Sequence, residues 1–298
     1  MAWKKGNRLR MVTEQEADAP TRCIYSEIKQ GLSTPALHDF YPALAAYPQF
    51  LRLHWNLMRP VVTSRQFHGC AERLRADAYT RAHNYLRIPD LTARLPEPDS
   101  SLPQLREAIE VFHHKDSLLL LLFSMQIQAM EAPVGKQIHD AGAASKPPAE
   151  APALVAESDA PASVRHTYEE IRRVLELPYV NAEYQAMARF PEYLNGYWEL
   201  LKSLLQSPLY QEGLFAIQES AWELARELPG PLELSVDQLI AEGMQEQEIA
   251  SIARILELFV KNLSGLVMNI AIAKISIEGG NQMTAGERVS PSDSERVA

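Results

Sequence analysis

The chain has 298 residues, of which 46% are hydrophobic and 22% charged, enough for more than one compact unit around a sizeable core. Its formal net charge of −9 repels phosphate backbones and argues against nucleic-acid binding. Two cysteines, Cys23 and Cys70, can form neither a disulfide framework nor a four-cysteine zinc site. The longest apolar run, residues 118–123, is too short to cross a membrane, and no secretory signal follows the basic start. We expect a globular, cytoplasmic protein.

The first predicted elements are helical. Pro35 and Pro48 divide the early sequence into a helix, a short helix, and a further helix that starts at Pro48 and carries Trp55. Trp55 follows Leu51 by four residues, so both lie on one helical stripe. Core packing is therefore a stronger interpretation of this tryptophan than ligand stacking.

A long buried helix is predicted after Ser101. Pro103 falls in its expected first turn and Gln104 is the expected capping partner of Ser101. Apolar positions then continue through residues 105–130, and Pro133 ends the pattern.

The next segment, residues 141–163, reads as a linker. It contains nine Ala and four Pro and no aromatic residue, so it has little apolar surface to offset the entropy of ordering. Two helices are then predicted near the end of the chain, one opened by Ser235 and a longer one running from Glu248 with an i, i+3, i+4, i+7 stripe. The polar tail from Gly279 onward is expected to fray.

An internal repeat relates the two sides of the linker. Twelve of 34 positions between residues 25 and 58 are identical to those 143 residues later. The identical pairs include Tyr25 and Tyr168, Ile28 and Ile171, Pro35 and Pro178, Tyr41 and Tyr184, Pro48 and Pro191, and Trp55 and Trp198. The sequence thus predicts an all-α fold of two homologous helical modules forming a pseudo-dimer, with a ligand site in the cleft between them.

This prediction divides the chain into five parts. They are a flexible N-terminus (1–19), a first repeat (20–136), an Ala/Pro-rich linker (137–163), a second repeat (164–278) and a flexible tail (279–298).

Common catalytic motifs are absent: the sequence has no Gly-x-Gly-x-x-Gly, P-loop, Cys-x-x-Cys or Gly-x-Ser-x-Gly pattern. Glu110-x-x-His113, followed by His114 and Asp116, matches half of the ligand set of a di-iron helical bundle. The second half of that set is missing. A solvated or pocket-edge polar turn is the better interpretation, and no metal or cofactor is expected.

Differences between the copies indicate where a site could lie. Phe40 in the first copy aligns with Glu183 in the second, within otherwise matching sequence that includes Asp39 and Tyr184. Lys115 has Asn as its counterpart. A shared site with charge from one module and apolar surface from the other would show this pattern, although composition alone favours an exposed Glu183 on a solvated turn.

At these residues the sequence resembles the group I 2-haloacid dehalogenases, which act on both enantiomers (DL-2-haloacid dehalogenase). The resemblance covers nearly the whole chain. It is carried by the Tyr-x-x-Ile openings at Tyr25 and Tyr168, the aromatic-Pro steps at Tyr47-Pro48 and Phe190-Pro191, and residues 183–188, 132–135 and 223–230.

The resemblance implies an all-α pseudo-dimer that assembles as a homodimer. It also implies hydrolytic removal of halide from C2 of a short 2-haloalkanoic acid, by an aspartate-activated water and without covalent intermediate or cofactor. The family's aspartate falls on Glu183, and its water-holding asparagine falls on or beside Lys115. Glutamate would move the base by roughly 1 Å, which can cost about 10²-fold in rate. A lysine ammonium nearby would weaken Glu183 as a base or bind the substrate carboxylate.

Three hypotheses remain open. In the first, the chain is a dehalogenase in which Glu183 activates water and Lys115, or its neighbours His113 and His114, orient water or substrate. Phe40 and Tyr184 then form apolar walls, and Asp39 also belongs to the substrate-binding site. In the second, a divergent member of the fold binds or transforms another small carboxylic acid. In the third, the chain is a helical interaction protein without a pocket.

Overall fold

The structure, a computed structural model, describes residues 10–137, here called the first half, and residues 150–281, the second half. All regular elements in these ranges are helices, and the only β pairing is three isolated bridges. The helices are α1 (Ala19–Gly31), α2 (Phe40–Leu44), α3 (Pro48–Val62), α4 (Arg65–Tyr85), the 3₁₀ turn η1 (Thr92–Arg94), α5 (Pro98–Glu131), α6 (Ala162–Val174), α7 (Ala182–Met187), α8 (Pro191–Leu205), α9 (Pro208–Ala225), α10 (Val236–Ala241) and α11 (Glu246–Ile277). The all-α prediction is confirmed for these residues.

Local capping explains where several helices begin. The Asp18 side chain accepts a hydrogen bond from the Thr21 amide at 2.8 Å at the start of α1, and Ser64 caps α4 in the same way. Pro48 starts α3 as predicted, because proline at the first helical position has no amide left unsatisfied.

The predicted start of α5 was wrong. The helix begins at Pro98, so Ser101 and Pro103 lie inside it and neither opens it. Ser101 Oγ donates to the Pro96 carbonyl, which draws the preceding chain onto the first turn. Pro98 is itself a favourable first helical residue, and the preceding Glu97 has left-handed backbone geometry.

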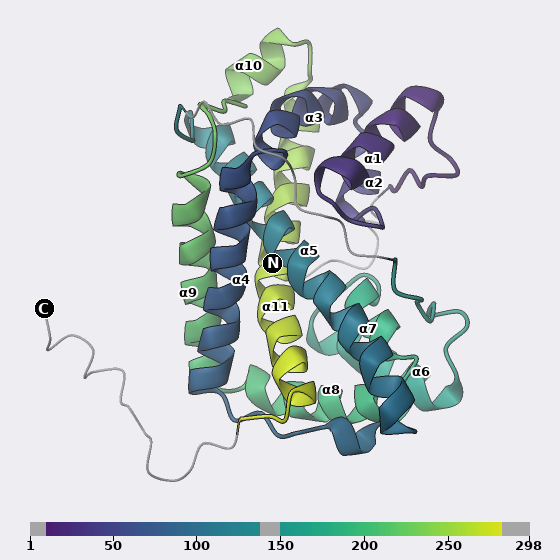
Figure 1. The fold of residues 1–298 in the computed structure, drawn as a ribbon. Coiled ribbons are helices and arrows are strands. Elements are labelled where there is room, and N and C mark those ends of the chain that lie inside the picture. Colours follow the sequence, from purple (N-terminus) through teal and green to yellow (C-terminus); the bar gives the residue numbers. More distant parts are fainter. Residues whose placement is uncertain (1–9, 138–149, 282–298) are drawn as a thin grey trace, which may run out of the picture.

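Four long helices, α4, α5, α9 and α11, pack together as the central bundle (Figure 1). Helices α1–α3 pack at one end of it and α6–α8 at the other. The halves also cross over: α5 of the first half contacts α7 of the second, and α11 of the second contacts α2 of the first. Side chains from both halves therefore meet along α5 and α11.

The same tyrosine hydrogen bond occurs in each half. Tyr25 Oη donates to the Val12 carbonyl at 2.7 Å, and Tyr168 Oη donates to the Val155 carbonyl at 2.8 Å. Both pairs fix the chain that precedes α1 or α6 onto that helix.

The tryptophans match in the same way. Trp55 Nε1 donates to Glu27 at 2.8 Å, and Trp198 Nε1 donates to Glu170 at 3.0 Å. Both indoles are buried, which confirms the predicted core role.

Parts of the predicted flexible N-terminus, linker and tail are packed against the rest of the protein. Ala17 is buried and Val12 bonds to the carbonyl of Pro42, so residues 10–19 pack against the first half. Residues 150–163, assigned to the linker, place Ala160 in the core. In the predicted tail, Asn281 is buried and donates to the Leu86 carbonyl. Short polar or Ala/Pro segments pack here because single side chains anchor them. Residues 1–9, 138–149 and 282–298 of these predicted segments lie outside the described residues.

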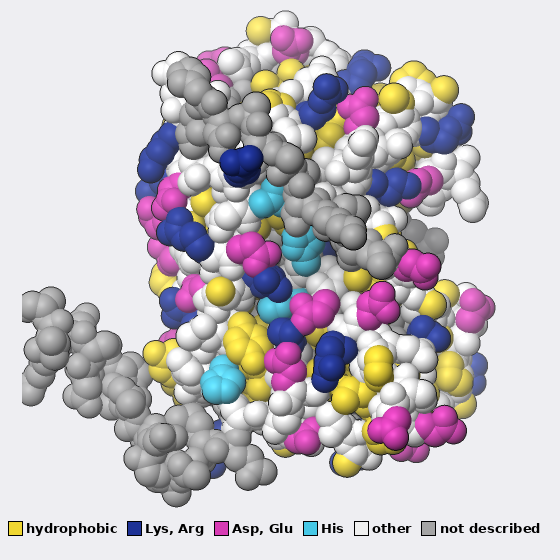
Figure 2. Space-filling model, in the orientation of Figure 1, with side chains coloured by type: hydrophobic (Ala, Val, Ile, Leu, Met, Phe, Trp, Pro, Cys, Tyr) yellow, Lys and Arg dark blue, Asp and Glu magenta, His cyan; other side chains and the backbone are white. Residues whose placement is uncertain are grey.

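Helix α11 is long and apolar enough to cross a membrane by length and composition alone. Of its most apolar window, 61% is buried inside the protein, as expected for the core helix of a bundle. On the face drawn in Figure 2, acidic and basic side chains are interspersed, so the net charge forms no single acidic patch there.

Candidate active site

Lys115 and Glu183 meet where the two halves cross over. Lys115 lies midway along α5, and Glu183 is the second residue of α7, which packs against α5. Lys115 Nζ donates to Glu183 Oε1 at 3.1 Å, with Glu183 only 4% exposed and Lys115 7% exposed. The interpretation of Glu183 as an exposed carboxylate was therefore wrong, because the short α7 presses this side chain onto α5.

Asp116 lies beside this pair and is completely buried. Its Oδ1 is 3.5 Å from Lys115 Nζ. Burial and the negative charge of Glu183 raise the pKa of Asp116 well above its ordinary value, although Lys115 opposes the shift. The sequence predicted a solvated or pocket-edge polar turn around Asp116. The solvated alternative is wrong for Asp116, because this part of α5 lies in the core.

Lys115 keeps its charge despite burial. Desolvation acts to lower the pKa of Lys115, but the carboxyl groups of Glu183 and Asp116 outweigh it and raise that pKa above the ordinary value. The site therefore contains a fixed ammonium, which can attract the carboxylate of an anionic substrate.

Asp39 extends the cluster toward the first half. It immediately precedes α2, is partly buried, and interacts with the hydroxyl of Tyr179. Burial raises the pKa of Asp39, while the Tyr179 hydrogen bond and the charge of Lys115 act against that rise. Asp39, a predicted substrate-binding residue, is therefore a partly buried acid that interacts with both Tyr179 and Lys115.

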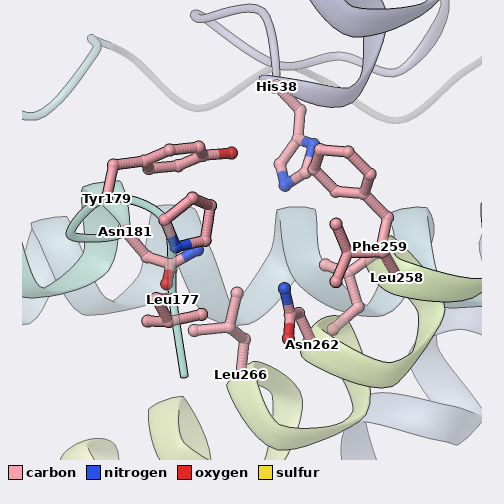
Figure 3. Close-up of a pocket in the computed structure, with 10 residues that line it drawn as sticks. His38, Leu177, Tyr179, Asn181, Leu258, Phe259, Asn262 and Leu266 are labelled. Atoms are coloured by element: carbon pink, nitrogen blue, oxygen red, sulfur yellow. The ribbon is translucent and has the colours of Figure 1, made fainter. Parts of the chain in front are cut away.

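A small cavity is lined by Tyr179, whose hydroxyl interacts with Asp39, and by His38, which precedes Asp39 in the chain (Figure 3). Its volume of about 10 Å³ is room for about one water molecule. The polar groups of His38, Tyr179, Asn181 and Asn262 border it together with apolar side chains such as that of Phe259. Burial and the charge of Lys115 hold the pKa of His38 well below its ordinary value, so this imidazole is neutral at pH 7.

A second cavity, of about 150 Å³, shares Asn181 and Asn262 with the first as lining residues. It also touches Tyr210 and Asn269. Lys115, Asp116 and Glu183 line neither of these two cavities.

Asn269 on α11 fixes the helix that carries Glu183. Its Nδ2 donates to Tyr184 Oη at 3.0 Å, and its Oδ1 accepts from Tyr210 Oη at 2.7 Å. Tyr197 donates to its backbone carbonyl at 2.7 Å. Tyr184 was predicted to line the binding site, but it is buried and holds α7 against α11. The position of Asn269 within the apolar run 266–273 of α11 was the signal for this role that the sequence interpretation missed.

Phe40 packs against Phe259, one of the residues that line the small cavity. It is fully buried, with its ring centroid 3.9 Å from that of Phe123 and 5.4 Å from that of Phe259. Phe259 itself lines the cavity, so Phe40 supports the apolar wall that the sequence predicted it to form.

His114 points away from the cluster, contrary to its predicted substrate-binding role. One residue along a helix turns the side chain by about 100°, and His114 Nδ1 lies 3.7 Å from Glu72 on α4. His113 is buried near Glu110, so the solvated alternative for this motif is wrong for His113, whereas Glu110 is partly exposed. In the described ranges, no group of three or more His, Cys, Asp or Glu side chains could hold a metal ion.

The chain is similar in sequence to known proteins. Residues 39–177 match the family described as halocarboxylic acid dehydrogenase DehI. An (R)-2-haloacid dehalogenase of Pseudomonas putida is 26% identical over 88% of this chain and 90% of its own length. An (R)-2-haloacid dehalogenase of Rhizobium sp. (strain NHG3) is 25% identical over 77% of this chain and 91% of its own.

Solved structures with a similar fold include D-2-haloacid dehalogenases. A D-2-haloacid dehalogenase mutant in complex with D-2-CPA has a TM-score of 0.83 and 26% identity, covering 91% of this chain and 97% of that one. A D-2-haloacid dehalogenase in complex with L-LA has a TM-score of 0.84 and 26% identity, covering 93% and 99%. Over most of its length the chain is therefore similar in sequence and fold to proteins named as (R)- or D-2-haloacid dehalogenases.

Proposed function

We propose that this chain is a hydrolytic 2-haloacid dehalogenase, which displaces halide from C2 of a short 2-haloalkanoic acid with water. The observation that carries the proposal is the near full-length similarity, in sequence and fold, to proteins named for that reaction. The buried ammonium and carboxyl groups between the halves supply groups suited to an anionic substrate and to proton removal from water.

The substrate class is narrower than the sequence resemblance implied. That resemblance was to a group acting on both enantiomers, whereas the relatives compared above are named for (R)- or D-2-haloacids. We therefore assign the (R)-2-haloacids as the preferred substrates.

In this proposal Glu183 is the water-activating base. It accepts a proton from a water molecule whose oxygen attacks C2 from the side opposite the carbon–halogen bond. The C–O bond forms as the carbon–halogen bond breaks, the halide leaves with the bonding pair, and the configuration at C2 inverts. Lys115 attracts the substrate carboxylate. Substrate entry into the small cavity beside Tyr179 would require its lining to move, because that space holds only about one water.

The site would then be shared between two homologous modules. The matched tyrosine and tryptophan hydrogen bonds support this reading, since each pair recurs 143 residues later with the same donor type and geometry. We extend the modules to include the packed segments, giving residues 10–137 and 150–281, and retain assembly as a homodimer and a cytoplasmic location as expectations.

The direct test is product formation from the separate enantiomers of 2-chloropropionate. Chloride release and lactate formation in equal amounts from the (R) enantiomer, with little from the (S) enantiomer, support the proposal. A pure, folded preparation that releases chloride from neither enantiomer contradicts it.

The same preparation tests the alternative of another small carboxylic acid. A ligand that binds the folded state raises the melting temperature. Stabilisation by non-halogenated 2-substituted acids, without stabilisation or turnover of haloacids, would favour the divergent-member hypothesis.

A further inference from the structure

The three buried charged residues Lys115, Glu183 and Asp116 comprise two acids and one base. Glu183 and Asp116 are 4% and 0% exposed, and the single cation between them is Lys115, with Nζ 3.1 Å from one carboxyl and 3.5 Å from the other. Two ionised carboxylates against one ammonium would leave an uncompensated negative charge in the core, which is energetically very costly. Retaining one proton makes the cluster neutral.

Geometry indicates which carboxyl retains it. Glu183 accepts the closer hydrogen bond from Lys115. The two oxygens of Asp116 are buried without a hydrogen-bond donor at normal distance among the described residues. An ionised Asp116 would be poorly stabilised there, whereas its protonated form can donate toward Glu183.

Among the residues that the structure describes, no second cation acts on Asp116 to correct this balance. The groups acting on Asp116 are Lys115 from its own helix and Glu183 from α7. Tyr184, also from α7, feels the charge of Asp116 and remains protonated. Asn269 of α11, which donates to Tyr184, is uncharged. Asp39 acts on Lys115 and adds a further acid, so it cannot supply the missing positive charge.

We propose that Glu183 and Asp116 form a carboxyl pair with one shared proton, held on Asp116, and that Asp116 is the positioning residue of the water-activating base. The protonation state stands on the structure alone, and only its catalytic consequence rests on the proposed function. Lys115 holds one oxygen of Glu183 while the acid proton of Asp116 orients the carboxylate from a second direction.

This arrangement has a consequence for the reaction. Before the reaction the three groups sum to zero charge. When Glu183 takes the proton from water, the cluster becomes a cation at the moment that negative charge develops on the departing halide. The positive charge of the buried cluster stabilises the negative charge that develops on the halide.

Infrared spectroscopy of the ligand-free protein tests the protonation state without relying on activity. At neutral pH we expect the band of a protonated carboxylic acid, shifted by ¹³C-labelled aspartate, unshifted by ¹³C-labelled glutamate, lost in Asp116→Asn and retained in Asp39→Asn. The isotope experiment needs only the wild-type chain, so it stands even if Asp116→Asn fails to fold. Absence of the band, or its shift with labelled glutamate, overturns the proposal.

The pH profile of kcat/KM for chloride release tests the positioning role. In the wild type, activity should fall on the alkaline side as Asp116 loses its proton. Asp116→Asn should lose this alkaline limb, keep the acidic limb and retain at least about a tenth of kcat, while Asp116→Leu should lose about 100-fold. Identical profile shapes for wild type and Asp116→Asn would overturn the positioning role. If infrared shows the proton on Asp116 but no haloacid is turned over, the proposed function fails and the carboxyl pair stands.

Discussion

Lys115 Nζ lies 3.1 Å from Glu183 Oε1, and this buried ion pair joins α5 of the first half to α7 of the second. Its position at the crossover makes it both a structural link between the halves and the centre of the candidate site. Changes to the pair should therefore affect stability and activity together.

Replacing Lys115 by methionine should destabilise the protein strongly. The variant leaves Glu183 beside Asp116 without a buried cation, and removing one partner of a buried pair costs about 3–5 kcal/mol. Urea unfolding would measure the loss, with Lys136→Met, an exposed lysine near the end of the first half, as the control. Equal free energies of unfolding for the two variants would show that the pair has no structural role.

The difference in stability between the wild type and Asp116→Asn should depend on pH in a defined direction. Because the folded-state pKa of Asp116 is raised above its unfolded value of 3.8, the folded protein holds a proton that the unfolded chain releases. The stability from this proton is complete below the unfolded pKa and is lost as pH rises toward the folded pKa, at up to about 1.4 kcal/mol per pH unit.

Asp116→Asn has no such proton. Its free energy of unfolding should therefore improve relative to wild type between about pH 5 and pH 8, as measured by urea titrations at several pH values. A difference that stays constant across this range would mean that the native protein does not hold the proton.

The two tryptophans should respond alike to the same substitution. Trp55→Phe and Trp198→Phe each remove buried volume and the indole hydrogen bond to Glu27 or Glu170. We expect each to cost about 1–3 kcal/mol. Trp222→Phe is the matched control because Trp222 is only partly buried. A large loss in only one of the two would argue against equivalent modules.

Much of the helical framework could be predicted from sequence. Pro48 and Pro191 mark helix starts correctly, and the stripe of α11 predicts its burial, because proline geometry and helical periodicity are local properties. The start of α5 was misplaced because Ser101 has the side chain of a cap but Pro98 already begins the helix.

The site was predictable only in part. The difference between Phe40 and Glu183 in the matching sequences directed attention to Glu183, which the structure places in the core beside Lys115. The role of Asp116 could not be read from its motif, because whether a helical acid faces water or core depends on the helices that pack around it. Tyr179 and His38 come from segments far apart in sequence, and only packing brings them to one cavity.

The source of the oxygen in the product separates direct hydrolysis from a covalent ester. With enzyme in excess over (R)-2-chloropropionate in H₂¹⁸O, direct attack by water should label the lactate formed in the first turnover. An ester on Glu183 would instead transfer an unlabelled carboxylate oxygen to that first product. Mass spectrometry of the lactate decides between the two.

The claim that Glu183, held between the halves, activates water is tested most directly by chloride release from (R)-2-chloropropionate by Glu183→Gln. The amide keeps the size of the side chain but cannot accept the proton, and loss of a general base typically costs about 10²–10⁴-fold. Glu192→Gln, an exposed change on the neighbouring α8, is the control and should keep the wild-type rate. The account predicts a loss of at least about 100-fold in kcat for folded Glu183→Gln, and a rate equal to that of Glu192→Gln would contradict it.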